Sequence, residues 1–514
     1  MKAVVKRIPG WMIFLFFLTF ITGIISYLPL LVKPTNVFYD IDSEATFVSN
    51  PLQFLYTGKI YFTDYPGTPT TALLSLIYLP WKLSYEIVSG KSFILWVVGH
   101  WNIVFWVMRT VSLTIFLLGY FWLHLSIYKL FKSYITNLFL FALFFFDPML
   151  QMNSTKVGIE TLAMVLVGFW FWLFTLHKIT KQNKYLWGMA FATGLLIANK
   201  TTYGLPIVAT FIISTISLES KKTSREKLRG VERILLLAIL GLVLGTLPVI
   251  YDYPRMLLWL LRTFFHTEPD GSGKFGLVDL SQFSMGINYW VSQRTAVPII
   301  ILLITVKSLL KKTHLHWKAL MWSGVIGFIV FLKFPVIRYQ PGNLILIFLS
   351  ATYFFNQLST KLKLAVVLVT MVVALFYGYE DYRMKRDLIS QSANLQTFVD
   401  QISADKDIIW EFGNSNDFSL IRARNFSNKF FNPQLAQTRA HLWELYIPNP
   451  TRVVDHYDKL HDINSFCWYG MIIQSKVYQS LFLPRQSNPN NFLAKPIPQT
   501  QMLFVQQRQC SIIN

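Results

Sequence analysis

The sequence predicts an all-α polytopic membrane protein, followed by a small C-terminal α/β domain. The chain is 53% hydrophobic and only 14% charged, whereas soluble domains carry about a quarter charged residues. Apolar runs of about 20 residues, the length that crosses a hydrocarbon core, recur and predict about eleven transmembrane helices. From about residue 380 onward these runs stop, and Asn, Gln, Pro and charged residues become frequent.

The first predicted element is a transmembrane helix at 11–32. It follows the basic residues Lys2, Lys6 and Arg7 and therefore resembles a signal peptide at first sight. The apolar run is too long for the hydrophobic part of a signal peptide, and it lacks a small-residue cleavage site. We therefore expect this helix to be retained.

The later apolar runs predict ten more spans. Residues 70–85 and 93–108 are also apolar, but they are short and interrupted by polar residues, so an interfacial helix fits them as well as a span does. The expected spans are 110–128, 135–152, 157–177, 184–199, 202–218, 234–252, 295–310, 317–333, 341–357 and 363–379.

Lys and Arg are concentrated in the loops on one side of these spans, most clearly in the loop 219–233. The positive-inside rule then places the N-terminus in the cytoplasm of a plasma (inner) membrane protein. The long loops 33–109 and 253–294 face outside. The expected domains are a membrane domain at 1–379 and an extracytoplasmic domain at 380–514.

The tail alternates short β-like runs with helical stretches. Its two cysteines, Cys467 and Cys510, are the only ones in the chain and do not form a metal-ligand spacing. An oxidising compartment would permit a disulfide between them, but the strand order is unknown, so bridged and free thiols are both open. We expect strands at Asp407–Phe412, Phe466–Ile473 and Met502–Gln507, and helices at Ser390–Ile402 and Phe418–Asn425.

The net charge is +21, and almost all of the excess lies in the membrane part. Anionic lipid headgroups and phosphate-bearing substrates are natural partners of such a surface. Nucleic-acid binding would need basic clusters interleaved with exposed aromatic residues on a soluble face. The sequence has no such pattern, so we expect membrane lipids as partners and no nucleic acid.

Three carboxylates follow the first span directly, in Phe38-Tyr39-Asp40-Ile41-Asp42-Ser43-Glu44. A low dielectric beside the membrane raises carboxyl pKa values and makes one of them a usable general base. A solvated acidic turn that caps a helix starting near Ser43 accounts for the same pattern.

The residues that follow carry a resemblance to a known family. Asp42-x-Glu44-Ala45-x-Phe47 leads to Tyr56-Thr57-Gly58-Lys59 and then to Asp64-Tyr65-Pro66-Gly67-Thr68-Pro69. This order resembles the first extracytoplasmic loop of the GT-C glycosyltransferases, the superfamily of protein mannosyltransferases and lipid A aminoarabinose transferases. Tyr65 stands where that family usually has His, and D-x-D-x-E replaces its D-D or D-E.

The resemblance implies a glycosyltransferase, a hexosyl- or pentosyltransferase, that uses a polyprenyl-phosphate-linked sugar. One carboxylate deprotonates an acceptor hydroxyl, which displaces the polyprenyl phosphate with inversion. We place this base at Asp42 ahead of Asp40, whose expected role is to steady the loop or help hold an ion. Glu44 and Tyr65 are expected to contact substrate. The acceptor, whether glycan, lipid or protein, and any need for a divalent cation are open, and no cofactor is certain.

The leaving phosphate needs cations near it. Arg338, next to Tyr339 at the outside end of two spans, offers paired donors to phosphate oxygens; a snorkelling interfacial arginine is the alternative. The resemblance also reaches Arg109, before the second main span, and the segment Asn153–Glu160. These residues are expected to bind substrate.

Glu160 stands at the outer start of a span, where an unpaired charge is costly. It either pairs with Lys156 or orients the donor sugar, and Lys200 between two spans is open in the same way. The Gly- and Pro-rich part of loop 253–294 suggests a mobile flap. There, His266 and Glu268 either help hold a metal or an acceptor, or belong to a plain loop.

Two other functions compete with this one. A transporter or flippase would normally show repeated halves, and the sequence has no internal repeat. An O-antigen-type polymerase or ligase also uses lipid-linked sugars, but it would lack the early acidic loop and carry its large loop late in the chain.

Overall fold

The computed structural model shows two compact units. Unit 1 comprises Met1–Ser26, Thr63–Leu73 and Thr110–Asp381, and unit 2 comprises Tyr27–Phe62, Leu74–Arg109 and Tyr382–Asn514. The residues that the structure describes are 10, 11, 14, 17, 18, 20, 21, 25, 44–58, 60, 67–93, 96–97, 100–144, 156–200, 209–213, 224–266, 275–276, 279–294, 296–310, 314–332, 340–401, 408–411, 470–474, 479, 492–498, 500 and 502–507.

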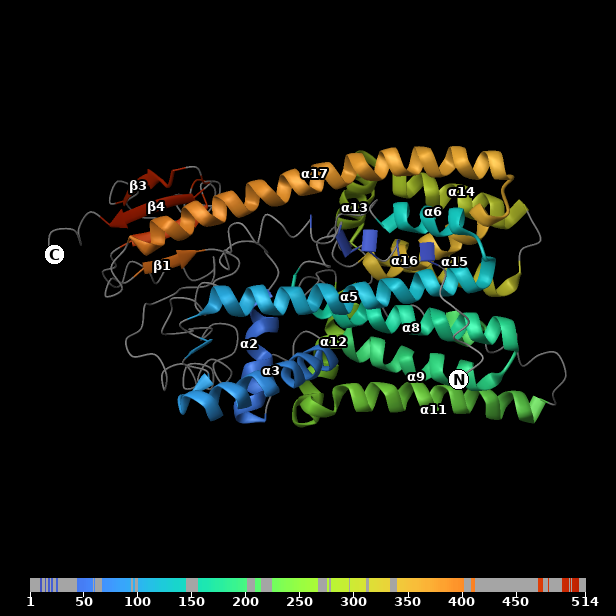
Figure 1. Cartoon of the computed structure of the whole chain (residues 1–514), viewed down its shortest axis with the longest axis horizontal. Coiled ribbons are helices and arrows are strands. Elements are labelled where there is room, and N and C mark those ends of the chain that lie inside the picture. The colour runs from blue at the N-terminus through green and yellow to red at the C-terminus, as the bar shows by residue number, and fades with distance from the viewer. Residues whose placement is uncertain are drawn as a thin grey trace. The chain divides into compact units, whose positions relative to one another are not determined.

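Unit 1 is a bundle of helices (Figure 1). Its longest segment begins within α5 (Trp101–Phe131) and ends within α17 (Thr360–Asp400). Between them lie α6 (Tyr134–Phe144), α8 (Ile159–Thr180), α9 (Asn183–Asn199), α11 (Ser224–Thr246), the 3-10 helix η2 (Leu247–Asp252), α12 (Tyr253–Phe265), α13 (Leu280–Gln293), α14 (Ala296–Leu310), α15 (Leu315–Phe331) and α16 (Pro341–Asn356).

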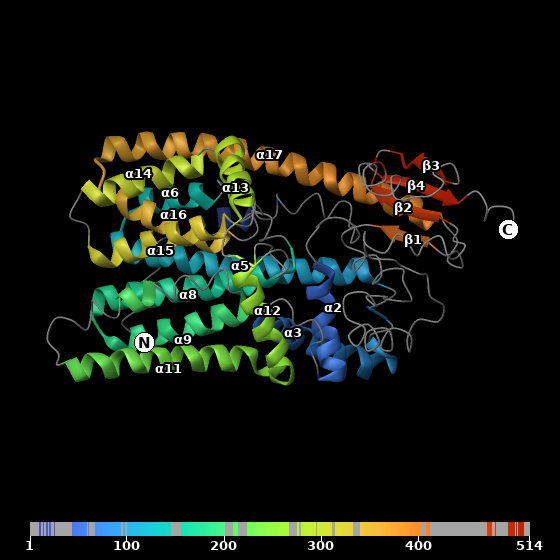
Figure 2. The same ribbon diagram turned by 180° about the vertical axis from the view of Figure 1, so that it is seen from behind.

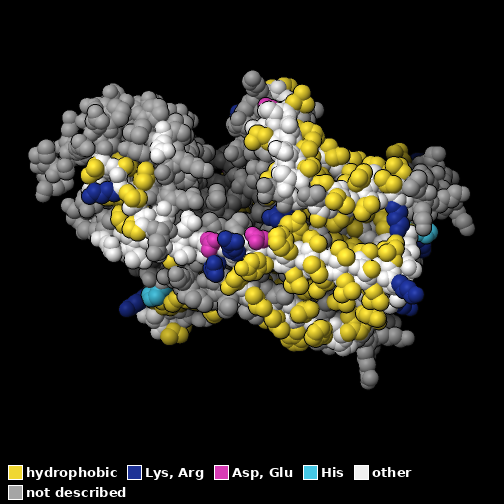
Figure 3. Space-filling view, turned by 90° about the horizontal axis from the view of Figure 1, so that it is seen from above, with side chains coloured by type: hydrophobic (Ala, Val, Ile, Leu, Met, Phe, Trp, Pro, Cys, Tyr) yellow, Lys and Arg dark blue, Asp and Glu magenta, His cyan; other side chains and the backbone are white. Residues whose placement is uncertain are grey.

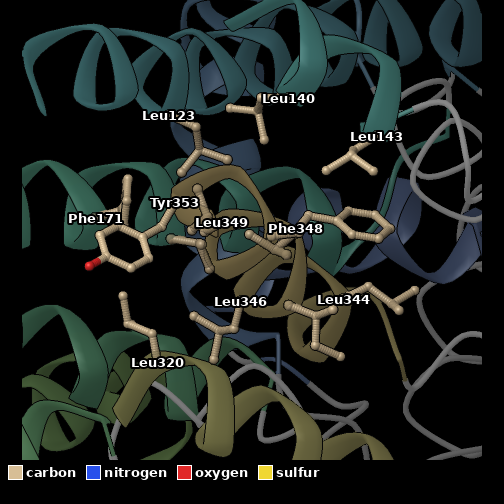
Figure 4. Close-up of a cluster of buried hydrophobic side chains, with 14 of the residues drawn as sticks. Leu123, Leu140, Leu143, Phe171, Leu320, Leu344, Leu346, Phe348, Leu349 and Tyr353 are labelled. Atoms are coloured by element: carbon tan, nitrogen blue, oxygen red, sulfur yellow. The ribbon is translucent and has the colours of Figure 1, made fainter. Parts of the chain in front are cut away.

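The core of this bundle is built around α16. Every residue from Pro341 to Phe355 is buried, as expected for a helix that is apolar on all sides. The ring of Phe355 stacks on Phe139 of α6 at 4.1 Å, and Tyr353 stacks on Trp317 of α15 at 4.5 Å. Figure 4 shows leucines of α6 and α15 pointing toward the same helix. Pro341 starts α16, since proline is pre-organised for the first helical turn.

Helices α8, α9 and α11 run side by side (Figures 1 and 2). The α9–α11 pair is close-packed because glycines replace side chains at the contact. A Cβ atom on Gly194 of α9 would collide with the backbone of Ala238 in α11, and one on Gly241 would collide with that of Phe191. Small residues let two helix backbones approach in this way in membrane proteins.

Four helices in the described part of the chain are long and apolar enough to cross a membrane. They are Ile103–Phe131, Ile159–Thr180, Leu228–Asp252 and Thr360–Glu380, and the bent pair Leu280–Ser292 and Ala296–Leu309 makes a fifth if it forms one broken span. Hydrophobic side chains cover much of the face of unit 1 shown in Figure 3. An exposed apolar surface of this extent marks an integral membrane protein.

Each predicted span that the structure describes contains helix, and within the described residues four or five helices are long and apolar enough to cross a membrane. The described parts of α6 and α15 are apolar but shorter than a full span. The predicted spans 11–32 and 202–218 fall mostly outside the described residues.

Two sequence expectations need correction. The interval 253–294 is not simply a loop, because α12 and α13 occupy most of it. Pro254 lies in the first turn of α12, and Asp279 caps α13 by accepting a hydrogen bond from the Ser281 amide at 2.8 Å. In addition, α17 runs unbroken through the expected span end at residue 379 to Asp400, since no proline or glycine interrupts residues 380–400.

Unit 2 contains α2 (Glu44–Thr57), most of α3 (Thr68–Ser89) and the first part of α5. The Glu86 carboxylate joins α2 to α3: it accepts a hydrogen bond from Tyr56 Oη at 2.9 Å and one from Lys82 Nζ at 2.8 Å. The Phe93 amide donates to it at 3.2 Å. The apolar stretch 70–85 lies entirely within α3. That helix is not among those apolar enough to span.

The tail of unit 2 forms a four-stranded sheet in the order β1-β2-β4-β3. Strands β1 and β2 are parallel, and β4 is antiparallel to both β2 and β3. Phe398 of α17 packs edge-on against Phe504 of β4, so the helix end covers the sheet. The sequence expectation was right for β1 (Ile408–Glu411), β2 (Gly470–Gln474) and β4 (Met502–Gln507), and it missed β3 (Phe492–Pro496). Phe418–Asn425, Cys467 and Cys510 lie outside the described residues.

Candidate functional site

Six of the predicted site residues lie outside the described residues: Asp40, Asp42, Tyr65, Glu268, Arg338 and Tyr339. Glu44 opens α2, and the description of that helix does not extend to its side chain. Arg109, Glu160 and His266 are described, and Glu160 belongs to a buried polar cluster in unit 1.

This cluster is centred on an ion pair between Glu160 and Lys200. Glu160 lies in the first turn of α8 and is 4% exposed, and Lys200, which ends α9, is 6% exposed. The Lys200 ammonium donates a hydrogen bond to Glu160 Oε1. Each charge stands at the helix end whose dipole favours it: an anion at an N-terminus and a cation at a C-terminus.

A second lysine is buried beside this pair. Lys156 is 3% exposed and acts electrostatically on Glu160. Between them stands Gly158, where an added Cβ atom would lie 3.0 Å from Glu160 Oε2 and 3.9 Å from Lys156 Cε. The glycine therefore leaves room for the carboxylate. Sequence analysis left open whether Glu160 pairs with Lys156 or orients the donor sugar. In the structure Glu160 forms a hydrogen-bonded ion pair with Lys200, and Lys156 also acts on its charge.

Asn199 holds the backbone around the pair. Its Oδ1 accepts hydrogen bonds from the Thr70 hydroxyl at 2.6 Å and the Thr70 amide at 3.2 Å. Its Nδ2 donates to the carbonyl of Ile159 at 2.7 Å. Asn199 is fully buried, and it ties together the start of α3, the start of α8 and the end of α9.

The cluster suits an anionic ligand. Two lysines surround one carboxylate, so the local charge of these three groups is positive. Burying charged groups costs several kcal/mol each in the absence of compensation. The neighbouring Thr161 hydroxyl is buried and has no hydrogen-bond partner within the described part of the chain. Buried polar groups normally have a partner, so a bound molecule or water would complete this site.

Arg109 is placed differently from the expectation. It lies inside α5, which begins at Trp101, rather than in front of a span. Its side chain is 2% exposed, and the guanidinium carbon stands 5.2 Å from the centre of the Phe105 ring. This is a cation–π contact within unit 2.

His266 closes α12 and pairs with the segment that follows. Its amide donates to the Arg262 carbonyl at 2.8 Å, and it forms an isolated antiparallel bridge with Phe275. The two rings meet edge to face at 6.0 Å. In the described residues no group of three or more His, Cys, Asp or Glu side chains comes together as a metal site.

Sequence reasoning missed Asn199, Thr70 and Gly158. Gly158 stands two residues before Glu160, and a glycine so near an acidic residue at the start of a predicted span could have indicated a role for Gly158. Asn199 and Thr70 are 129 positions apart in the chain, and no local pattern connects them.

The helical bundle, its apolar surface and the small mixed sheet define an integral membrane protein, and its fold is that of the GT-C-like structures described next. It is similar to the crystal structure of ArnT from Cupriavidus metallidurans in the apo state, with a TM-score of 0.51 and 11% identity over 98% of each chain. It is equally similar to ArnT from Cupriavidus metallidurans bound to undecaprenyl phosphate, with a TM-score of 0.51 and 10% identity over 97% of this chain and 98% of that one.

At such identities the likeness shows the fold. No protein-family model and no curated protein sequence matches the chain. The fold resemblance expected from the acidic first loop is thus confirmed by the structures, over nearly the whole length.

Proposed function

We propose that this protein is a glycosyltransferase that moves a sugar from a polyprenyl-phosphate-linked donor to an acceptor hydroxyl on the extracytoplasmic side of the membrane. One observation carries the proposal: the fold matches, from end to end, that of a protein solved with undecaprenyl phosphate bound. The buried lysine-rich cluster around Glu160 supports it, because a phosphate-linked sugar needs cationic and hydrogen-bonding partners.

In the proposed reaction, Asp42 takes the proton of the acceptor hydroxyl. The oxygen attacks the anomeric carbon from the face opposite the phosphate, the bond from that carbon to the phosphate oxygen breaks, and polyprenyl phosphate leaves as an anion. The configuration inverts in this single displacement. Asp40 steadies the loop, and Arg338 and Tyr339 stabilise the leaving phosphate.

Glu160 is assigned to the donor sugar. Its carboxylate is held by Lys200 and oriented by the Asn199 contacts at the same helix ends. Lys156 and Lys200 offset the negative charge of the donor. Glu44, Tyr65, Arg109, His266 and Glu268 are assigned to substrate binding, with the acceptor being a glycan, lipid or protein.

The test is the Asp42→Asn variant of the purified full-length protein. Its turnover is measured as release of undecaprenyl phosphate from a panel of hexosyl and pentosyl undecaprenyl phosphates in the presence of membrane extract as acceptor. Loss of a general base costs on the order of 100- to 10,000-fold in rate. Because the amide keeps the side-chain shape, binding of undecaprenyl phosphate should change little.

Asp387→Asn is the matched control, since Asp387 is an exposed carboxylate on α17 whose nearest ion pair, to Arg386, spans 3.6 Å at the surface. It should retain full turnover. A dead Asp40→Asn beside an active Asp42→Asn would exchange the two roles. Full activity of both would refute the catalytic loop.

A further inference from the structure

The opposite end of α9 from Lys200 carries a second polar site, which the proposed transfer reaction does not use. There α9 and α11 line an open cavity of about 190 Å³. The distance along α9 from Trp187 to Lys200 is about 20 Å at 1.5 Å per residue, so this cavity is separate from the Glu160 cluster. Its lining consists of Asn183, Leu186, Trp187, Glu226, Arg229, Gly230, Arg233 and Ile234.

The cavity exists because of how the two helices pack. Their backbones touch at Gly194 and Gly241, where no side chain separates them. Toward the start of α9 the contact residues become large, and the half-buried Trp187 stands between the helices. The guanidinium of Arg233 lies over its indole ring, 4.9 Å from the centroid. Trp and Arg with these positions are typical of the membrane–water interface.

The cavity has the charge of an anion site. Arg229 and Arg233 are exposed side chains one turn apart on α11, and the lining contains one acidic residue, Glu226. Guanidinium groups bind phosphate oxygens through paired hydrogen bonds. Arg225 in the first turn of α11, and Lys221 and Lys222 just before this helix in the sequence, add further positive charge. A general excess of basic residues on one side of the membrane explains this charge, but it does not explain a cavity between two helices.

An apolar track continues from the arginines along the same face of α11. Leu236, Leu240 and Leu244 follow Arg229 and Arg233 at helical spacing, and they are 59%, 47% and 49% exposed. From Arg233 to Leu244 the helix rises about 16 Å, which is about half of the roughly 30 Å hydrocarbon core. A ligand that fills the cavity therefore has room for a hydrocarbon tail one leaflet long.

We propose that this cavity binds the phosphate headgroup of an anionic membrane phospholipid, whose acyl chain lies along the leucine track of α11. Basic pockets between transmembrane helices recognise lipid headgroups through the same combination of charge and depth. Neutral lipids lack the net charge that Arg229 and Arg233 select, and free phosphate lacks the tail that the track accommodates.

The experiment uses the full-length protein in a neutral detergent, titrated separately with dioleoyl-phosphatidylglycerol, dioleoyl-phosphatidylcholine and inorganic phosphate. Phosphatidylglycerol should raise the midpoint of thermal unfolding and remain bound in native mass spectra, and the other two should do neither. Arg229→Gln/Arg233→Gln should weaken phosphatidylglycerol binding about tenfold or more, since each basic residue at a membrane surface contributes on the order of a fivefold change.

Lys361→Gln/Lys363→Gln is the matched control, because it removes two positive charges at the start of another helix, α17, away from the cavity. It should leave the titration unchanged. Equal binding by the arginine variant, or an equal shift with inorganic phosphate alone, would overturn the proposal.

A photoactivatable phosphatidylglycerol on the wild-type protein provides the second measurement, should the arginine variant fail to fold. Crosslinks are expected on peptides within 183–244. Crosslinks confined to other helices would refute the site. Undecaprenyl phosphate binding, measured in parallel, should be unaffected by the arginine substitutions. A failure of the lipid-site proposal can therefore be distinguished from a failure of the proposed transferase function.

Discussion

The ion pair between Glu160 and Lys200 is costly to bury and therefore informative. Replacing a buried pair by apolar residues is often neutral for stability, whereas removing one partner leaves an uncompensated charge and costs about 3–5 kcal/mol. Here the carboxylate faces two buried lysines, so the loss of Glu160 would leave two buried positive charges without the negative charge that offsets them. A group retained at such a cost is expected to serve the substrate as well as the fold.

Glu160→Gln should lower the unfolding midpoint in detergent by several degrees and abolish turnover. The double variant Glu160→Gln/Lys200→Gln should recover much of the stability, because no charge of the pair is then left unmatched. If the carboxylate orients the donor sugar, turnover stays lost in the double variant. Recovery of turnover along with stability would show that the pair is purely structural. Thermal unfolding and product release, measured on the same preparations, separate the two results.

Asn199→Ala should destabilise unit 1 by about 3 kcal/mol, because it leaves the Thr70 donors and the Ile159 carbonyl buried without their partner. Asn288→Ala removes an exposed asparagine of α13 and serves as the control, with an expected change within about 0.5 kcal/mol. Unfolding midpoints of the two variants give the comparison. A midpoint for Asn199→Ala equal to that of the wild type would mean that the clamp does not hold these helix ends.

At the scale of the element, α2 and α3 depend on the Glu86 carboxylate. Burial by itself would raise its pKa, but hydrogen bonds from Lys82, Tyr56 and the Phe93 amide outweigh this effect and lower the pKa below its usual value. A lowered carboxyl pKa stabilises the fold above the unfolded-state value of about 4.3. That stabilisation is lost as the pH falls through the lower folded-state pKa.

Glu86→Gln should therefore be less stable than the wild type at pH 7, and the difference should narrow as the pH falls below about 4.3. The measurement is the unfolding midpoint of both proteins between pH 7 and pH 3.5. If the difference in unfolding midpoint between wild type and Glu86→Gln is constant across this range, the charged form of Glu86 does not contribute to stability.

At the scale of the whole molecule, the transferase proposal requires one orientation in the membrane. The basic segment 219–233, which belongs to α11 from Ser224 onward, is expected inside and the tail outside. In a background without Cys467 and Cys510, a cysteine placed at Asn449 should react with a membrane-impermeant maleimide added to intact cells, and one placed at Ser224 should react only after permeabilisation. The reverse result would put the acidic loop in the cytoplasm and refute the proposed site of transfer.

Much of the fold could be predicted from the sequence, because runs of neighbouring apolar residues show where the helices lie. Each described part of a predicted span is helical, and three of the four strands fall where β-like runs were seen. The span count was less predictable. The described parts of α6 and α15 are apolar but shorter than a span, and burial inside the bundle makes a segment as apolar as lipid contact does. The amphipathic α12 was missed because its glycine- and proline-rich continuation indicated a loop.

The sequence by itself determined that this is a membrane protein, the order of its helices and the resemblance of its first loop to the GT-C glycosyltransferases. These properties depend on composition, on run length and on motifs of neighbouring residues. Only the tertiary structure decided that Glu160 pairs with Lys200 and that Asn199 joins Thr70 to Ile159. Glu160 and Lys200 are 40 positions apart, and Thr70 and Asn199 are 129 positions apart. Helix packing alone brings these partners together. The energy that selects one buried partner over another arises between helices, so it leaves no periodic signal along the chain.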